Sequence, residues 1–372
     1  MRLCFFKDPN SSGRNSGNSY LFPTLPRIVM SLRSYIIARI LLTIPMIMLL
    51  LTFVFLIIRV LPGDPASLHF EKNVAPATLL AFKQQLGLDR PLIVQYFDYL
   101  AALVRGDFGI SMQDFSPVSQ QIFSAFPATL ELAITSTIIM MVLGVLLGAT
   151  AARSYNTTKD HSIRVFGIAS YAIPVFFLGE VLIMIFGIYL RWLPAGGRMY
   201  PGISPVGLLI DGQRYATGLY VLDSLLEGDL QKLYLSIRYL ILPSLALGLV
   251  LCGIFIRLTR SNMLETLQLD FITAARARGL KERTVVYGYA LRNAFLPILT
   301  MMGLQFAALL AGAILTETTF SWPGLGRYLV DRISFRDYTA IQGVVVFFGL
   351  LVTAVSLVVD MLYAYLDPRI RL

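Results

Sequence analysis

Six long apolar stretches alternate with polar segments along this chain. Each stretch is long enough to cross about 30 Å of hydrocarbon as a helix, because a helix rises about 1.5 Å per residue. The pattern therefore predicts an all-α integral membrane protein with six transmembrane helices. The stretches lie near residues 36–60, 128–151, 164–190, 236–257, 293–315 and 340–365.

The spacing of these stretches divides the chain into four parts. Residues 1–33 are expected to form a disordered cytoplasmic extension, since they contain an Asn-, Ser- and Gly-rich run without helical periodicity. A first transmembrane helix over 34–60 and an extracytoplasmic segment over 61–127 follow. Residues 128–372 are then expected to form a five-helix core, which contains a basic cytoplasmic loop over 258–292.

The extreme N-terminus carries a separate expectation. Met30 opens a sequence that would be a natural start for a membrane protein of this kind, and no signal peptide precedes it. We therefore expect residues 1–29 to be dispensable for function, and deletion of these residues tests this.

The positive charges predict the orientation of the chain. With both termini in the cytoplasm, the cytoplasmic segments hold 18 Lys and Arg in 95 residues, and the extracytoplasmic segments hold 11 in 136. Positive residues concentrate on the cytoplasmic side of membrane proteins, so both termini are predicted to be cytoplasmic. The cytoplasmic segments are 1–39, 151–164, 257–292 and 367–372, and the others are 61–127, 191–235 and 316–339.

Composition excludes a soluble domain and a disulfide framework. Hydrophobic residues make up 56% of the chain, charged residues 14%, and the mean hydropathy is +0.70, whereas soluble domains carry about 25% charge. The two cysteines, Cys4 and Cys252, lie in a polar tail and an apolar stretch, so no disulfide is expected. The net charge of +9 reflects membrane topology, and no nucleic-acid partner is expected.

The basic loop has the features of a short helix, a sharp turn and a second helix. Asp270 is placed to cap the first helix, because its carboxylate can accept the free amides of the first turn. Gly279 lies where a helix ends through a left-handed residue, and a second helix is predicted from about Lys281. The same residues also fit a solvated basic loop that merely follows the charge asymmetry.

This loop resembles the "EAA" cytoplasmic loop of permease subunits of binding-protein-dependent ABC importers. In that family the loop ends in a coupling helix that docks into a groove of the ATPase subunit. Thr273 stands where the general pattern has Glu, a departure that also occurs in the peptide and nickel branch. The resemblance assigns ATPase coupling to Asp270, Thr273, Ala274, Ala275, Arg276, Arg278, Gly279, Leu296 and Pro297.

Further motifs resemble the first permease of the dipeptide, oligopeptide and nickel transport family, which is dipeptide-permease-B-like. Together they cover the chain from about residue 34 to residue 372. The resemblance implies the type I, MetI-like permease fold. The motifs lie at residues 59–65, 86–96, 105–111, 321–326, 336–343 and 360–371.

The resemblance also implies partners and a location. They are a second homologous permease, two cytoplasmic ATP-binding subunits, an extracytoplasmic solute-binding protein and the lipid bilayer. The chain would then lie in the cytoplasmic (inner) membrane of a bacterium or archaeon. Together with the second permease it would form an alternating-access path for di- or oligopeptides. Relatives with these motifs also carry nickel chelates or glycans, and the sequence does not choose among these substrates.

The chain itself carries no motif for chemistry. No lysine is followed by Ser or Thr, which excludes a phosphate loop of the Gly-x-x-x-x-Gly-Lys-Ser/Thr type. No catalytic or metal-ligand constellation occurs, so we expect no enzyme activity, cofactor or metal. A stand-alone secondary transporter is the alternative, but the paired inverted repeats typical of that class are not found.

Charged residues inside the predicted spans are candidate functional groups, because burying a charge in a membrane is costly. Glu180 lies near the middle of the third span, where the family usually has an apolar residue. It either lines the translocation path or makes a contact between helices. Glu131 and Arg257 lie near span ends and are expected to extend toward the interface. Gly144 and Gly148 form a small-residue motif for close helix packing, either internal or with the partner permease.

Overall fold

The computed structural model describes residues 32–60, 89–200, 202–205, 207–210 and 213–366. The expectations for residues 1–29, for the extension over 1–33 except its last two residues, and for the motif at 59–65 except its first two residues lie outside this part. So do the first three residues of the motif at 86–96 and the last five of the motif at 360–371. The described secondary structure is helical except for one antiparallel hairpin of two short strands, β1 (Leu208–Ile210) and β2 (Gln213–Tyr215).

Five helices in the described part are long and apolar enough to cross a membrane. The first, second, fourth, fifth and sixth predicted spans each correspond to one of these helices, and the fifth is preceded by a short helical segment. The second begins earlier than the predicted core boundary at residue 128. These helices are α1 (Leu32–Val60), α5 (Val118–Arg153), α9 (Leu230–Thr266), α12 (Leu291–Gly312) and α15 (Tyr338–Leu366).

The third predicted span is broken. Instead of one straight helix over 164–190, the chain forms α6 (Thr158–Ala172), then α7 (Val175–Leu182) continued by the π-helix η1 (Ile183–Tyr189), with a bend of 100° between them. Pro174 causes the break, since a proline lacks the amide that would continue the helix and disfavours helical backbone in the residue before it. With the bent pair counted as one span, the part of the chain that the structure describes holds six, as predicted.

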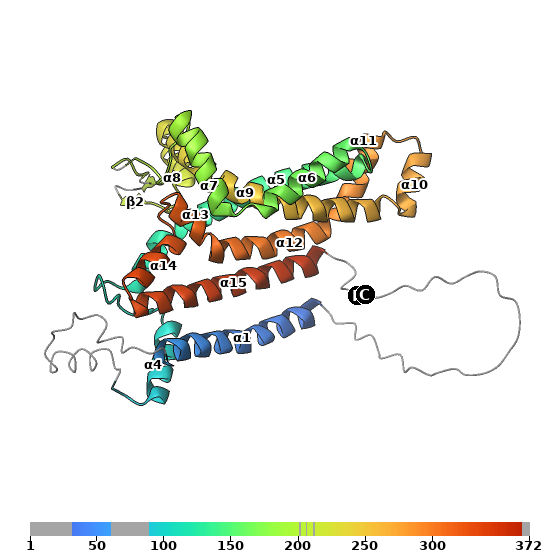
Figure 1. Cartoon of the computed structure of the whole chain (residues 1–372). Coiled ribbons are helices and arrows are strands. Elements are labelled where there is room, and N and C mark those ends of the chain that lie inside the picture. Colours follow the sequence, from blue (N-terminus) through green and yellow to red (C-terminus); the bar gives the residue numbers. More distant parts are fainter. Residues whose placement is uncertain (1–31, 61–88, 201, 206, 211–212, 367–372) are drawn as a thin grey trace, which may run out of the picture.

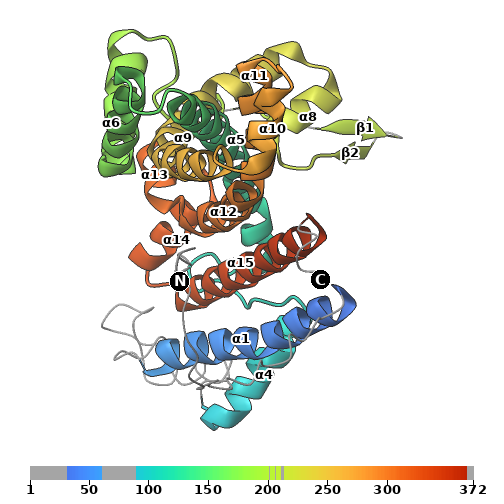
Figure 2. The same ribbon diagram turned by 90° about the vertical axis from the view of Figure 1, so that its right-hand side faces the viewer.

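The spans are arranged in a definite order across the molecule. Figures 1 and 2 show α1 beside α15, α15 beside α12, α12 beside the α5–α9 pair, and α6 on the far side of α9. The pair α5–α9 is central, and α1 touches the rest mainly through α15, where Leu51 and Val54 meet Val346.

Close packing within the central pair depends on glycine. A Cβ on Gly144 would collide with the Cβ of Phe255, and one on Gly148 would lie 2.6 Å from the Cβ of Thr259. Such contacts are too close for any other side chain, so α5 and α9 can approach only because these positions are glycines. The small-residue motif therefore serves packing inside this chain.

The shorter elements gather at the two ends of the helix bundle (Figure 1). We call these the α10 end and the α14 end. Among the described residues, the polar segments that are richer in Lys and Arg lie at the α10 end, and the polar segments that are poorer in them lie at the α14 end. At the α14 end lie α4 (Leu92–Val104), α8 (Tyr220–Glu227), α13 (Ile314–Thr319) and α14 (Leu325–Ser334). At the α10 end lie α10 (Asp270–Ala277), α11 (Glu282–Thr284) and the π-helix η2 (Val285–Ala290).

Candidate functional site: the α10 loop

The helix α10 begins one residue earlier than its predicted cap implies. Leu269 is the capping residue, with an extended backbone (φ −76°, ψ 148°), and Asp270 is the first helical residue. The prediction that Asp270 is the N-cap is therefore wrong by one position. Its carboxylate still lies in the first turn, where a negative charge favours the helix dipole.

The end of α10 is the predicted left-handed turn. Gly279 has φ +73°, its amide donates to the Arg276 carbonyl at 2.9 Å, and the Leu280 amide donates to the Ala275 carbonyl at 3.4 Å. These two bonds make the Schellman arrangement, in which a left-handed glycine closes the last turn. The prediction that the helix ends through a left-handed residue at Gly279 is confirmed, and the coupling role of this residue stays a prediction.

One face of α10 is held firmly by the ends of the spans. Ile272 and Ala275 are buried against an apolar cluster, with the half-buried Leu280 packed beside them. Because a close-packed cluster transmits displacement, α10 and the helices beneath it are expected to move together. The other buried members of the cluster are Ala149, Ala152, Met263, Val285, Val286, Ala290 and Ala294.

The other face of α10 is open to solvent and bears short side chains and cations. Thr273, Ala274 and Arg278 are exposed. Arg276 forms an ion pair with Glu282 across the turn, with 2.8 Å between its Nη2 and the Glu282 Oε1. The predicted coupling residues thus divide into one buried member, Ala275, and an exposed face that another protein can reach.

Leu296 and Pro297 are not part of this face. Both lie inside α12, beyond η2, where Leu296 lines a small apolar cavity with Val359 and Leu362. The structure therefore does not bring these two residues together with α10, and their role in coupling stays a prediction.

Glu180 lies on α7, after the bend of the third span. Its side chain is exposed. Within the described residues it has no hydrogen bond or ion pair, so no contact between helices satisfies its carboxylate in this chain. A role in the translocation path stays a prediction.

The prediction that Glu131 extends toward the membrane interface is wrong. The Glu131 side chain is 6% exposed and accepts hydrogen bonds from Arg198, itself 7% exposed, at 2.7 Å. The Val221 amide donates to the other carboxylate oxygen at 2.7 Å, and Arg198 also donates to the Gly218 carbonyl at 2.7 Å. This buried pair holds the segment after η1 against α5. The only sign of it in the sequence was an acidic residue inside a predicted span.

A second buried carboxylate fixes the turn between α13 and α14. The Thr129 hydroxyl donates to Glu317 Oε1 at 2.7 Å, and the Arg327 amide donates to Oε2 at 3.0 Å. Nearby, the Trp322 indole donates to the Ala128 carbonyl at 2.9 Å. Burial raises the pKa of Glu317 above its usual range. The turn at Pro323 and Gly324 is therefore held by specific contacts to α5, which the sequence did not indicate.

A third polar group joins α14 to the segment before α5. Arg332 donates two hydrogen bonds to Asp114, at 2.8 and 2.7 Å. Asp337 is buried and accepts hydrogen bonds from the Ser111 hydroxyl at 2.5 Å and the Met112 amide at 3.1 Å. The hydrogen bonds from Arg332 hold the pKa of Asp114 below its usual range.

The lowered pKa of Asp114 predicts an acid-dependent contribution to stability. Its ionised form is favoured in the folded chain, so the contribution is present above the ordinary pKa of about 3.9 and is lost as the pH falls through the lower folded-state value. An Asp114→Asn change should lower the free energy of unfolding at pH 7 by no more than about 1 kcal/mol, because the pair is partly exposed. Thermal unfolding of both proteins across pH measures the difference.

The control for this prediction is Asp331→Asn, on the same helix as Arg332. The Asp331 side chain is exposed and has no ion pair with any residue that the structure describes. Its substitution should leave the unfolding temperature nearly unchanged. A difference between Asp114→Asn and the unsubstituted protein that persists at pH values below the lowered pKa of folded Asp114 would show that charge is not its cause.

Comparison with known protein families agrees with the arrangement of spans. Residues 144–372 match the family described as "Binding-protein-dependent transport system inner membrane component". Residues 32–133 match the family described as "Binding-prot-dependent transport system membrane comp, N-term". Both the α10 loop and the polar contacts at the α14 end fall within these two ranges.

Individual relatives match over nearly their whole length. The di/tripeptide transport system permease protein DppB of Pseudomonas aeruginosa (strain UCBPP-PA14) is 40% identical over 339 residues, which cover 91% of this chain and 98% of that protein. The probable D,D-dipeptide transport system permease protein DdpB of Escherichia coli (strain K12) is 41% identical, covering 85% and 91%. The glutathione transport system permease protein GsiC of Salmonella choleraesuis (strain SC-B67) is 38% identical, covering 91% and 99%.

Proposed function

This chain belongs to the family of inner membrane components of binding-protein-dependent transport systems, and we propose that it is the permease subunit of an ATP-driven importer of short peptides. The family consists of multi-pass permease subunits of ABC importers, in which other subunits hydrolyse ATP. The observation that carries the substrate class is 40% identity over 91% of the chain to a di/tripeptide permease.

The α10 loop is the proposed contact with the ATPase. Its exposed face around Ala274 has small side chains that allow close approach, and its buried face around Ala275 is packed on the ends of the spans. A docked subunit that displaces α10 would therefore displace the spans as well, because the buried side chains of the cluster are in contact with both and close-packed side chains transmit displacement. Asp270, Thr273, Arg276, Arg278 and Gly279 complete this surface or its turn.

The proposed orientation places the α10 end in the cytoplasm, with both termini on that side. The excess of Lys and Arg in the segments at this end supports it. The proposed assembly contains a second homologous permease, two ATP-binding subunits at the α10 end and a solute-binding protein at the α14 end. Glu180 is proposed to line the path between the two permeases, which labelling of a Glu180→Cys variant by a water-soluble thiol reagent would test.

Reconstitution into vesicles tests the proposed function. With its partner subunits and binding protein, the chain should support ATP-dependent uptake of labelled dipeptides and tripeptides. Without them it should neither hydrolyse ATP nor accumulate peptide. Accumulation by the chain alone, driven by an ion gradient, would contradict the proposal and favour a secondary transporter. Uptake of a nickel chelate or a glycan in place of peptides would contradict only the substrate class.

A further inference from the structure

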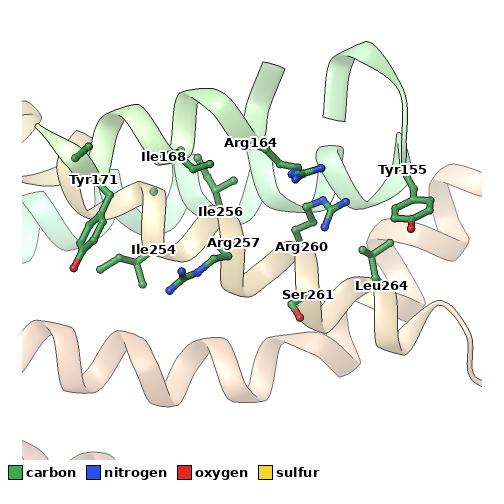
Figure 3. A pocket seen from close by; sticks show the side chains of 13 residues that line it. Tyr155, Arg164, Ile168, Tyr171, Ile254, Ile256, Arg257, Arg260, Ser261 and Leu264 are labelled. Carbon is green, nitrogen blue, oxygen red and sulfur yellow. The ribbon is translucent and has the colours of Figure 1, made fainter. Parts of the chain in front are cut away.

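A cavity of about 680 Å³ lies between α6 and α9. Figure 3 shows that its lining changes character along its length. Tyr171, Ile168 and Ile254 lie toward one end, Arg164 and Arg260 lie toward the other, and Arg257 lies between them with its guanidinium pointing toward Ile254. The cavity is therefore amphipathic, with an apolar part and a cationic part.

The base of the cavity is a close contact between the two helices. A Cβ on Gly253 would collide with the carbonyl oxygen of Gly167, and both glycines line the cavity. The helix backbones therefore meet here without side chains between them. The longer side chains on each side of this contact form the walls of the cavity. The cavity therefore results from the packing of α6 against α9.

The cationic part is not neutralised within this chain. Arg260 donates two hydrogen bonds to Asp160, at 2.7 and 2.9 Å, and its guanidinium lies 5.5 Å from the centre of the Tyr155 ring. Arg164 and Arg257 form no salt bridge with any residue in the described ranges. Three arginines line the cavity and the one carboxylate that pairs with them is Asp160, so about two positive charges remain among the described residues.

The position of these charges matches a membrane surface. Arg257 and Arg260 lie in the C-terminal part of α9, which runs to the α10 end, and Arg164 lies midway along α6. Figure 3 shows Ile168, Ile254 and Tyr171 farther from that end. Arg164 and Tyr171 are separated by about 10 Å along a helix that rises about 1.5 Å per residue. That distance corresponds to a headgroup region followed by the first part of an acyl chain.

We propose that this cavity binds an anionic phospholipid of the leaflet at the α10 end. Its phosphate accepts hydrogen bonds from Arg164 and Arg257, since planar guanidinium groups match phosphate oxygens. Its acyl chain lies along Ile168 and Ile254 toward Tyr171. Basic pockets between transmembrane helices on the cytoplasmic side have the chemistry to bind such headgroups.

A protein helix fits this cavity less well than a lipid does. An apolar helix from a second subunit would cover Arg164 and Arg257 without supplying a counter-charge, and burying an uncompensated charge is costly. A phospholipid supplies both the negative charge and the apolar chain. The lipid would also lie beside the α10 loop, because a second cavity, lined by Arg276 and Glu282, shares Tyr155 and Leu264 with this one.

Tryptophan quenching by brominated lipid tests the proposal. The complete transporter carrying Tyr171→Trp is placed in phosphatidylcholine vesicles that contain either brominated phosphatidylglycerol or brominated phosphatidylcholine. The signal of the unsubstituted transporter, which includes Trp192 and Trp322, is subtracted. We expect an apparent association constant about tenfold higher for phosphatidylglycerol. This preference should disappear with Arg164→Gln and Arg257→Gln and persist with Lys at both positions.

The control reporter is Leu49→Trp on α1, where the native side chain is 73% exposed, and it should show no preference between the two lipids. Equal quenching of the 171 reporter by both lipids would overturn the proposal. Absence of quenching by either lipid would also overturn it, because another protein chain would then cover the cavity. Loss of the preference on addition of inorganic phosphate would show a phosphate site in place of a lipid site. None of these outcomes depends on peptide uptake, so the proposed function is tested separately.

Discussion

A Gly279→Val variant of the transporter should assemble and hydrolyse ATP but import peptide at least about tenfold more slowly. Gly279 has φ +73°, and a Cβ there would meet no atom within 4 Å. Valine therefore causes no collision, but a β-branched residue in left-handed backbone costs on the order of 1–3 kcal/mol. Relaxing that strain changes the turn and shifts α10 relative to η2, and this interrupts the proposed transmission of movement from the ATPase to the spans.

Gly228→Val is the matched control for this prediction. Gly228 has φ +74°, a Cβ there would likewise meet no atom within 4 Å, and the residue ends α8 at the α14 end of the molecule. The backbone strain is the same, but the site is remote from α10, so uptake per ATP hydrolysed should stay near that of the unsubstituted transporter. The measurement is the ratio of peptide uptake to ATP hydrolysis in vesicles.

Two outcomes would contradict the coupling role. If Gly279→Val imports peptide normally, the geometry of this turn does not matter for transport. If both variants lose uptake to the same degree, strain itself damages the protein and the position of Gly279 has no special meaning.

Features that depend on neighbouring residues could be predicted from the sequence. The turn at Gly279 follows from local backbone preference, because a glycine after a short helical run favours a left-handed helix end. The spans follow from length and hydropathy, because the hydrocarbon thickness sets the length of an apolar helix. The break at Pro174 has a local cause as well. The residues on both sides of it are apolar, however, and hydropathy alone cannot separate one straight helix from two at an angle.

Features that depend on distant residues could not be predicted. Glu131 and Arg198 are 67 positions apart, and Thr129 and Glu317 are 188 apart, so no local pattern pairs them. The sequence marked Glu131 as unusual because an acid in a span is costly. It could not show that a cation from the segment after η1 would reach this acid. The same limitation applies to the cavity between α6 and α9, whose arginines lie on two separate helices.

Glu131→Ala is the second substitution for which we expect a large effect. It should lower the free energy of unfolding by about 3–5 kcal/mol. Both side chains of the Glu131–Arg198 pair are less than a tenth exposed, and Arg198 also lies 3.8 Å from the centre of the Tyr220 ring. Removing the carboxylate leaves a buried guanidinium without its counter-charge and a Val221 amide without its acceptor. Denaturant unfolding of the purified protein in detergent measures the loss.

The exposed pair Arg90–Asp98 provides the control, since its side chains are 59% and 60% exposed. Asp98→Ala should cost less than about 1 kcal/mol because water screens the exposed charges. Removing both buried charges with Glu131→Leu and Arg198→Met should recover most of the stability lost in Glu131→Ala, because the penalty comes from the unpaired charge that remains. If the double variant is as unstable as the sum of the single variants, the two residues act independently. In that case the pair does not fasten the segment after η1 to α5.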